Sequence, residues 1–343
     1  MSLILFKPSY PFEPISTVAA LARCLRIEEA VLVGVAAEAD GMYRLVKPIP
    51  PSTRECFDAR GVLKKIHEQI KVKIFFHVDF PPYLQGSIKK RSYYSNAALH
   101  IGQQMLITED VKKFFPSVTA SRVFNVWRNF FRFSDEVSEL LTKLTTKDGV
   151  LAQGAIPSSY LANLVLWEIE PFFHARFAAE GITYSRYVDD MIMSSKTHLT
   201  KEQQRQIVSR VMGMVREVGL SIGRNKHKIY SASIPMIATK VVVNRKPSLT
   251  VRKRSAVRTQ VFQLELAVAR GDRSVEAFKL AEKASQSVGQ LGRFHKTAEA
   301  RSLKERVHSV RLILRAGGGP VFVTYSPPSQ KSIVTQNSVS APW

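Results

Sequence analysis

The sequence has too few cysteines to support a disulfide framework or a zinc site. Cys24 and Cys56 are the two cysteines among 343 residues, and their spacing fits no zinc motif. We therefore expect a reducing compartment, the cytoplasm. The apolar residues near the start, Ser2–Phe6, are followed by a proline-containing stretch, so this run is too short for a signal peptide or a membrane span. These absences argue against a secreted or membrane-spanning protein.

Acidic residues are scarce relative to basic ones. There are 28 Asp and Glu against 50 Lys and Arg, which gives a formal net charge of +22. An excess of this size favours a polyanionic partner, because a basic surface attracts nucleic acid electrostatically. A solvated lysine surface is the alternative. The basic residues are concentrated in two stretches, Lys89–Arg91 and Arg245–Arg258.

The most informative acidic residues lie in the stretch Tyr187-Val188-Asp189-Asp190. It is flanked by two short apolar runs, at 182–184 and 191–193, which predicts a β-hairpin with adjacent carboxylates at its tip. A third carboxylate, Asp110, follows the apolar run at 105–107. Carboxylates this close repel each other unless a positive charge lies between them. A divalent metal ion would supply that charge.

Three aspartates at two strand ends match the requirements of phosphoryl transfer by two metal ions. Two Mg²⁺ ions about 3.5–4 Å apart can clamp the attacking and the leaving oxygens, and these hard cations prefer oxygen ligands. A solvated turn is the alternative, and it would be the better interpretation of an isolated Asp-Asp pair. The motifs around the pair decide between the two.

Five segments carry a resemblance to a known family. They are Arg91-Ser92 with Asn96–His100, Asp110–Phe115, Leu151–Asn163, Tyr187–Asp190, and Gly219–Ile222 with Lys226 and Lys228 behind it. In this order they resemble the RS…NAxxH element, the first catalytic motif, the LPQGAPxSPxLxN segment, the YxDD box and the following lysine motif of bacterial retron-type reverse transcriptases. The resemblance runs from about residue 43 to about residue 264. Each segment is weak evidence alone, whereas the ordered set is specific.

The resemblance implies roles for the site residues. Asp110, Asp189 and Asp190 would be the catalytic residues and the ligands of two Mg²⁺ ions. The incoming deoxynucleoside triphosphate would be bound by further residues: Arg54, Phe115, Gln153, Gly154 and Lys228. Phe115 would pack under the sugar and exclude a 2′-hydroxyl, with a core phenylalanine as the alternative. For Lys228 the alternatives are Lys226 in the same role, or a solvated lysine.

Two groups of residues are expected to contact nucleic acid. Arg91, Asn96 and His100 belong to the first group, although a structural role is the alternative for Asn96 and for His100, where it would be that of a buried histidine. Arg252, Lys253, Arg254 and Arg258 form the second group. These four are expected to bind phosphates, which position a duplex without reading its sequence.

The expected fold class is α+β, a right-hand polymerase with fingers, palm and a helical thumb. Apolar spacing predicts helices at 15–25, 27–35, 62–74 and 158–178, two helices within 121–144, and a strand at 43–49. A capping box at Thr200 and Gln203 predicts a helix that ends at Gly219. We expect an N-terminal helical extension (1–42), a fingers and palm core (43–247), a helical thumb (248–315) and a flexible tail (316–343).

The chain departs from the retron pattern in three places. Ala152 and Ile156-Pro157 replace the usual residues of the nucleotide-side loop. Ala238-Thr239-Lys240 stands where retron enzymes usually have Val-Thr-Gly, and the segment from Pro50 to Cys56 lacks the common Gly-Lys-x-Arg form. These differences are compatible with a retron-like enzyme from the wider group of bacterial defence-associated reverse transcriptases.

The resemblance implies an RNA-directed DNA polymerase that extends a 3′-hydroxyl on a dedicated non-coding RNA, in antiphage defence. Its partners would be that RNA, the RNA–DNA duplex and deoxynucleoside triphosphates, with an effector protein, a second subunit or a second copy of the chain as further candidates. No membrane is expected. The alternatives are a polymerase that makes low-complexity or untemplated DNA, and a non-catalytic RNA-binding scaffold. An RNA-dependent RNA polymerase is disfavoured because those enzymes usually carry Gly-Asp-Asp.

Overall fold

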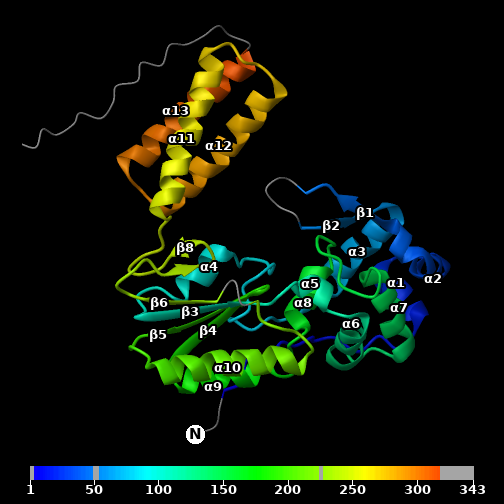
Figure 1. The fold of residues 1–343 in the computed structure, drawn as a ribbon. Coiled ribbons are helices and arrows are strands. Elements are labelled where there is room, and N and C mark those ends of the chain that lie inside the picture. Colours follow the sequence, from blue (N-terminus) through cyan, green and yellow to red (C-terminus); the bar gives the residue numbers. More distant parts are fainter. Residues whose placement is uncertain (1–3, 49–53, 224–226, 317–343) are drawn as a thin grey trace, which may run out of the picture. The chain divides into compact units, whose positions relative to one another are not determined.

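The computed structural model describes residues 4–48, 54–223 and 227–316 (Figure 1). The chain divides into two compact units, Met1–Thr250 and Val251–Trp343. The first unit contains helices and antiparallel sheets, and the second contains helices among its described residues. The predicted α+β class is therefore confirmed. The predicted tail at 316–343 lies, apart from Ala316, outside the described residues.

A four-stranded antiparallel sheet forms the centre of the first unit. Its strands are ordered β4-β5-β3-β6, with bounds Met105–Asp110 (β3), Ile182–Tyr187 (β4), Asp190–Ser195 (β5) and Lys228–Ser231 (β6). The register places Asp190 opposite both Asp110 and Tyr187. The predicted hairpin is thus confirmed, with Val188 and Asp189 as its two-residue turn.

Helices cover both faces of this sheet. Helices α9 (Glu170–Ala179) and α10 (Lys201–Glu217) lie on one face (Figure 1). The capping box predicted for α10 is present, because Thr200 and Gln203 each bond the other's backbone N–H. On the other face, His100 follows α4 (Tyr93–Ala98) and bonds side chains of β4 and β5.

One prediction in this region is wrong. Residues 158–178 form two helices, α8 (Ser158–Leu164) and α9, rather than one. Pro171 explains the break, since proline has no N–H for an interior helix bond and is tolerated only in the first turn. The chain therefore restarts a helix at Glu170, which places Pro171 in the first turn of α9.

The remaining part of the first unit is mainly helical. Its main helices are α1 (Val18–Leu25), α2 (Glu29–Glu38), α3 (Gly61–Lys73), α5 (Phe114–Ser117), α6 (Ala120–Asn125) and α7 (Asp135–Thr145). The strands β1 (Tyr43–Val46) and β2 (Cys56–Ala59) form an antiparallel ribbon. The predictions of helices near 15–25, 27–35 and 62–74 and of two helices within 121–144 are confirmed. The strand predicted for 43–49 ends at Val46.

A second, smaller hairpin packs against α4. Strands β7 (Ile237–Ala238) and β8 (Val241–Val242) are joined by Thr239 and Lys240. The Thr239 hydroxyl donates to the Tyr93 carbonyl at 3.0 Å and accepts from Asn96 Nδ2 at 3.3 Å. The triplet that departs from the retron pattern is therefore bonded to the helix that carries the RS…NAxxH element.

Up to Ala316, where the described part of the chain ends, the second unit is a bundle of three helices, α11 (Val251–Ala269), α12 (Val275–Phe294) and α13 (Ala298–Ala316). Apolar residues at three- and four-residue intervals are buried between them, for example Val257, Val261 and Leu264 of α11. Arg306 of α13 makes a two-pronged ion pair with Glu265 of α11. Among the described residues of both units, no helix is long and apolar enough to cross a membrane.

Candidate active site

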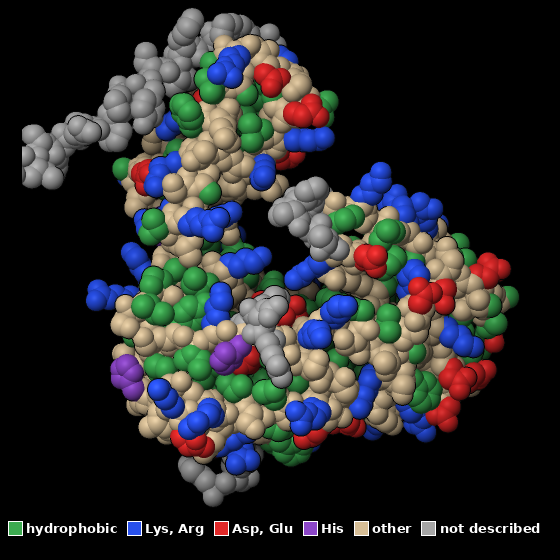
Figure 2. Space-filling view, in the orientation of Figure 1, with side chains coloured by type: hydrophobic (Ala, Val, Ile, Leu, Met, Phe, Trp, Pro, Cys, Tyr) green, Lys and Arg blue, Asp and Glu red, His purple; other side chains and the backbone are tan. Residues whose placement is uncertain are grey.

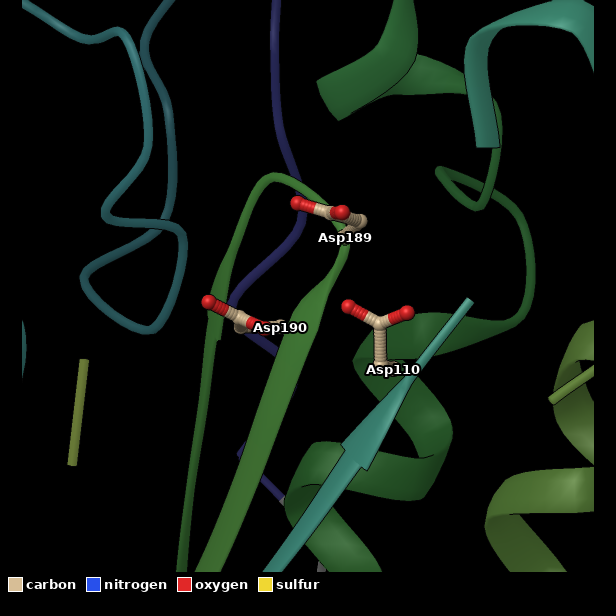
Figure 3. A group of neighbouring side chains, drawn as sticks. All are labelled: Asp110, Asp189 and Asp190. Atoms are coloured by element: carbon tan, nitrogen blue, oxygen red, sulfur yellow. The ribbon is translucent and has the colours of Figure 1, made fainter. Parts of the chain in front are cut away.

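Three aspartates meet where β3 and the β4–β5 hairpin end. Figure 3 shows Asp110 at the end of β3 and Asp189 and Asp190 on the hairpin beside it. Their carboxylate oxygens lie within 4.8 Å of one another. The backbone fixes this grouping, because Asp110 pairs with Asp190 in the register and Val111 N donates to Asp189 O at 3.1 Å. Asp110 is 6% exposed, and the other two are half-buried.

This donor set fits a divalent metal ion. Each carboxylate offers a hard oxygen, the ligand type that Mg²⁺ and similar cations prefer. Three negative groups at this separation repel one another, and a cation bound between them would remove that repulsion. Asp110, Asp189 and Asp190 are therefore the residues that would hold the metal.

A cleft of about 1220 Å³ opens beside the aspartates. Three of the predicted nucleotide-binding residues line it together with Asp110 and Asp189, namely Arg54, Phe115 and Gln153. Three lysines that the sequence analysis did not assign also line it: Lys112, Lys113 and Lys147. Lys112 and Lys113 lie two and three residues after Asp110, inside the Asp110–Phe115 segment, a proximity that could have identified them. Figure 2 shows Lys and Arg side chains over the visible face of each unit.

Gly154 does not line the cleft itself, yet its conformation fixes the loop that does. Its φ is +102°, and a Cβ there would lie 2.9 Å from the Phe57 carbonyl oxygen. Phe57 N also donates to the Gln153 carbonyl at 2.7 Å. Only glycine avoids the clash and adopts this φ without strain. The backbone of Gly154 therefore lies close to that of β2.

Phe114 and Phe115 lie on the short helix α5 rather than on a strand. Phe114 is 3% exposed and belongs to the core, while Phe115 is half-buried and packs against that core from the cleft side. The helix follows Lys113, whose φ is +45°. This bend directs the chain from β3 into α5, where the centroids of the two rings lie 5.9 Å apart.

Lys228 lies on β6, opposite Thr108 of β3. Opposite residues of an antiparallel pair point to the same face, and residues two apart on a strand do as well. Lys228 therefore shares a face with Asp110. It is exposed and is not among the described residues that line the cleft. Its competitor, Lys226, lies outside the described residues.

Asn96 and His100 do not reach the surface, which favours the structural alternative for both residues over a contact with nucleic acid. Both side chains are 0% exposed. His100 bonds the hydroxyls of Ser194 and Ser185, each at 2.7 Å, and burial lowers its pKa to about 3. Asn96 donates to the Thr239 hydroxyl. These residues join the strands of the catalytic hairpin to α4 and to the β7–β8 turn.

Arg91 is half-buried and bonds the chain around it. Its guanidinium donates to the carbonyl oxygens of Phe80 at 2.6 Å, Pro81 at 2.5 Å and Leu84 at 2.6 Å. Three of its five N–H groups are thus committed to the protein backbone. This arrangement gives Arg91 a structural role in the loop that precedes α4.

The other predicted nucleic-acid contacts lie on α11 of the second unit. Arg252, Lys253 and Arg258 are exposed, and Arg254 is partly buried. Arg258 forms an ion pair with Glu299 at 3.0 Å, with both side chains about half exposed. A pair this exposed contributes little to stability and is easily exchanged for another partner.

Comparison with known proteins finds a matching family and relatives in sequence. Residues 48–264 match the family described as "Reverse transcriptase (RNA-dependent DNA polymerase)". The chain is 31% identical over 294 residues to the retron Se72 reverse transcriptase of Salmonella heidelberg (strain 579083-10), covering 84% of this chain and 78% of that protein. It is 30% identical over 329 residues to the retron Ec48 reverse transcriptase of Escherichia coli, covering 89% and 79%. Among solved structures, the truncated apo telomerase from Candida tropicalis aligns at a TM-score of 0.37 and 12% identity, over 55% of this chain and 44% of that one.

Proposed function

The chain belongs to the reverse transcriptase family and is an RNA-directed DNA polymerase, and from that premise we propose how its residues divide the work. The observation that supports the proposal best is the grouping of Asp110, Asp189 and Asp190 within 4.8 Å. All three lie in the stretch that matches the family, and two of them line the cleft. A scaffold that only binds RNA has no need of three mutually repelling carboxylates.

The proposed metal ligands are Asp110 and Asp189, shared by two Mg²⁺ ions, with Asp190 supporting the primer-side ion or the hairpin. Bound there, the ions would neutralise phosphate charge and favour ionisation of the primer 3′-hydroxyl. The aspartates supply oxygens held by the strand register. The near-complete burial of Asp110 limits the water around it, which strengthens its electrostatic interactions.

The incoming deoxynucleoside triphosphate is proposed to occupy the cleft. Arg54 suits the triphosphate, because a guanidinium can donate two parallel bonds to phosphate oxygens. Lys112 and Lys113 add positive charge to the same wall. Phe115 is proposed to pack under the sugar and exclude a 2′-hydroxyl. Gln153 and Gly154 are assigned to the loop beside the nucleotide and the template base, and Lys228 to the leaving pyrophosphate.

The template–primer duplex is proposed to contact the helical unit. Arg252, Lys253, Arg254 and Arg258 would bind its phosphates. We also propose that 1–42 is an N-terminal extension, 43–247 the fingers and palm core, and 248–315 the thumb. The boundary between the two compact units, after Thr250, supports the assignment of the thumb. We further propose a dedicated non-coding RNA as template and antiphage defence as the biological role, as the resemblance to retron-type enzymes implies; the relatives' names support the retron type itself.

The test is to express the chain with its neighbouring genomic DNA and to sequence the nucleic acids that co-purify. The control is the double variant Asp189→Ala/Asp190→Ala. A discrete DNA complementary to one bound RNA, absent from the control, is the expected result. A low-complexity product would support untemplated synthesis. The altered loop residues Ala152 and Ile156-Pro157 are the reason for considering this alternative. Bound RNA without any DNA that depends on the aspartates would contradict the proposal.

A further inference from the structure

The turn that carries Asp189 has an unfavourable backbone. Val188, the first of its two residues, has a φ of +60°, whereas the φ of Asp189 is not positive. This is the pattern of a type II′ turn, which normally has glycine at the first position. A β-branched residue in this region is strained. The surrounding structure must therefore hold the turn in place.

Arg186 of β4 bonds this turn from inside the protein. Its side chain is 0% exposed, and its Nη1 donates to the Val188 carbonyl at 3.2 Å. The same guanidinium donates to the carbonyls of Ala162 at 3.2 Å and Asn163 at 2.9 Å, in α8. One rigid planar group thus connects the strained residue to a helix from a distant part of the chain.

Glu170, the first residue of α9, fixes the position of that guanidinium. Its two carboxylate oxygens accept from Arg186 Nε and Nη2, each at 2.7 Å, and Oε1 also accepts from the Tyr184 hydroxyl at 2.7 Å. Glu170 is 1% exposed. Burial alone would lower the pKa of Arg186, but the carboxylate outweighs it and the pKa is raised. The arginine therefore stays charged.

The outer side of the turn is in contact with Gly86. A Cβ at this position would lie 2.4 Å from Val188 Cγ2 and 2.5 Å from Val188 N. Asn163 Nδ2 donates to the Gly86 carbonyl at 2.7 Å. The loop also runs beside β4, since Gln85 N donates to Arg186 O at 2.8 Å. Val188 is thus held between the Gly86 backbone and the guanidinium of Arg186.

We infer that Arg186, Glu170 and Gly86 are positioning residues that set the metal affinity of the aspartate group by holding the Val188–Asp189 turn. The inference rests on the proposed function of the three aspartates. Buried ion pairs are weak sources of net stability, which makes a purely structural role a poor account of this pair. Outer partners that orient metal ligands typically change affinity by about 10–100-fold when removed.

The test measures metal binding directly, by electron paramagnetic resonance of Mn²⁺ titrated into the purified full chain. Gly86→Ala is the main variant, since it pushes on Val188 and leaves the buried charges intact. We expect Mn²⁺ affinity to fall by about tenfold, and kcat for primer extension to fall more than the KM for the nucleotide changes. Glu170→Gln and Arg186→Lys should act in the same direction.

Two matched controls separate positioning from general destabilisation. Gly34→Ala makes the same substitution in α2, where a Cβ meets nothing within 4 Å. Glu265→Gln weakens the similar two-pronged pair with Arg306 in the helical unit. Both should bind Mn²⁺ as the unaltered protein does. Circular dichroism and melting in EDTA verify that each variant is folded, and Arg186→Lys replaces Gly86→Ala if the latter does not fold.

The outcomes distinguish this inference from the proposed function. Unchanged Mn²⁺ affinity in a folded Gly86→Ala or Arg186→Lys variant would overturn the inference, even if the unaltered protein makes DNA. If the unaltered protein binds Mn²⁺ at the aspartates but extends no primer, the proposed function fails, while a lower affinity in the variants still supports the positioning role. Loss of affinity in the controls as well would also overturn the inference, since it would indicate a general effect of destabilisation.

Discussion

Two hairpins of the first unit, β4–β5 and β7–β8, have turns of the same length, and both lack glycine where the backbone favours it. In the β7–β8 turn, Thr239 and Lys240 have φ values of +43° and +70°; in the β4–β5 turn, Val188 has +60°. The Thr239 side chain is bonded to Tyr93 and Asn96 of α4. The β4–β5 turn instead presents Asp189 to the aspartate group and is held between Gly86 on its outer side and the buried Arg186 on its inner side.

The difference shows that backbone strain alone does not identify a functional site. One turn uses its own side chain to bond the neighbouring helix, and its strain is offset by those bonds. In the β4–β5 turn, the Asp189 side chain carries one of the repelling charges, so the turn is supported by other residues, Arg186 and Gly86. Substitutions in the β4–β5 turn should therefore affect function, and substitutions in the β7–β8 turn should affect stability.

The largest expected effect is at the catalytic turn. Asp189→Asn should lower primer extension by about a thousandfold or more, the scale seen when a group acts directly in the chemistry. Its melting temperature without metal should stay the same or rise, because one of three repelling charges is gone. Extension assays and melting in EDTA measure both. A variant that is inactive only because it is unfolded would contradict the assignment.

The next effect is on the pH dependence of stability. His100 joins the strands of the catalytic hairpin, and burial lowers its pKa from 6.5 to about 3. Its neutral form therefore stabilises the fold fully above pH 6.5, and this contribution is lost as the pH falls from 6.5 towards 3. At pH 5 the loss is about 2 kcal/mol.

Denaturant unfolding of the unaltered protein and of His100→Gln, at pH 7 and pH 5, isolates the contribution of His100 to the free energy of unfolding. The free energy of unfolding should fall less in the variant over this range. His67, whose pKa burial lowers to about 4, is present in both proteins and cancels. Equal pH dependence in the two proteins would show that His100 is not the group responsible.

A smaller effect is expected at the β7–β8 turn. Thr239→Val removes the hydroxyl that bonds Tyr93 O and Asn96 Nδ2. Leaving these groups unpaired should lower the free energy of unfolding by about 1–2 kcal/mol. The Mn²⁺ affinity of the aspartates should not change. A tenfold loss of that affinity would mean that the two turns are coupled.

The smallest effect is expected from Lys240→Gly. Glycine adopts a φ of +70° without strain, so the variant should gain about 0.5 kcal/mol, with part of the gain offset by a more flexible unfolded chain. The free energy of unfolding in urea measures this. A loss of stability would show that the Lys240 side chain stabilises the fold by more than its positive φ destabilises it.

Local features were predictable from the sequence, and long-range contacts were not. The hairpin and Asp110 follow from short apolar runs and a turn, so pattern alone was sufficient. The choice between a structural role and an RNA contact for Asn96 and His100 could not be made from the sequence, because their partners, Thr239 and the two serines, lie 85 to 143 residues away in the chain. Nothing local distinguishes a polar residue bonded inside the protein from one that contacts RNA.

The support of the catalytic turn was missed for a related reason. Arg186 directly precedes the Tyr-Val-Asp-Asp stretch, and by composition it belonged with the many basic residues expected at the surface. Its burial depends on Glu170, which the sequence analysis placed inside one continuous helix. Because Pro171 forces α9 to begin at Glu170, recognising that break would have drawn attention to this acidic residue.

The most direct test of the central claim is extension of a DNA primer on an RNA template by the unaltered chain and by Asp110→Asn. Asp135→Asn, a change of the same kind at an exposed position of α7, is the control. We predict incorporation of deoxynucleotides by the unaltered chain and by the control, and none above background by a folded Asp110→Asn. Undiminished extension by Asp110→Asn would contradict the assignment of the aspartate group as the catalytic centre.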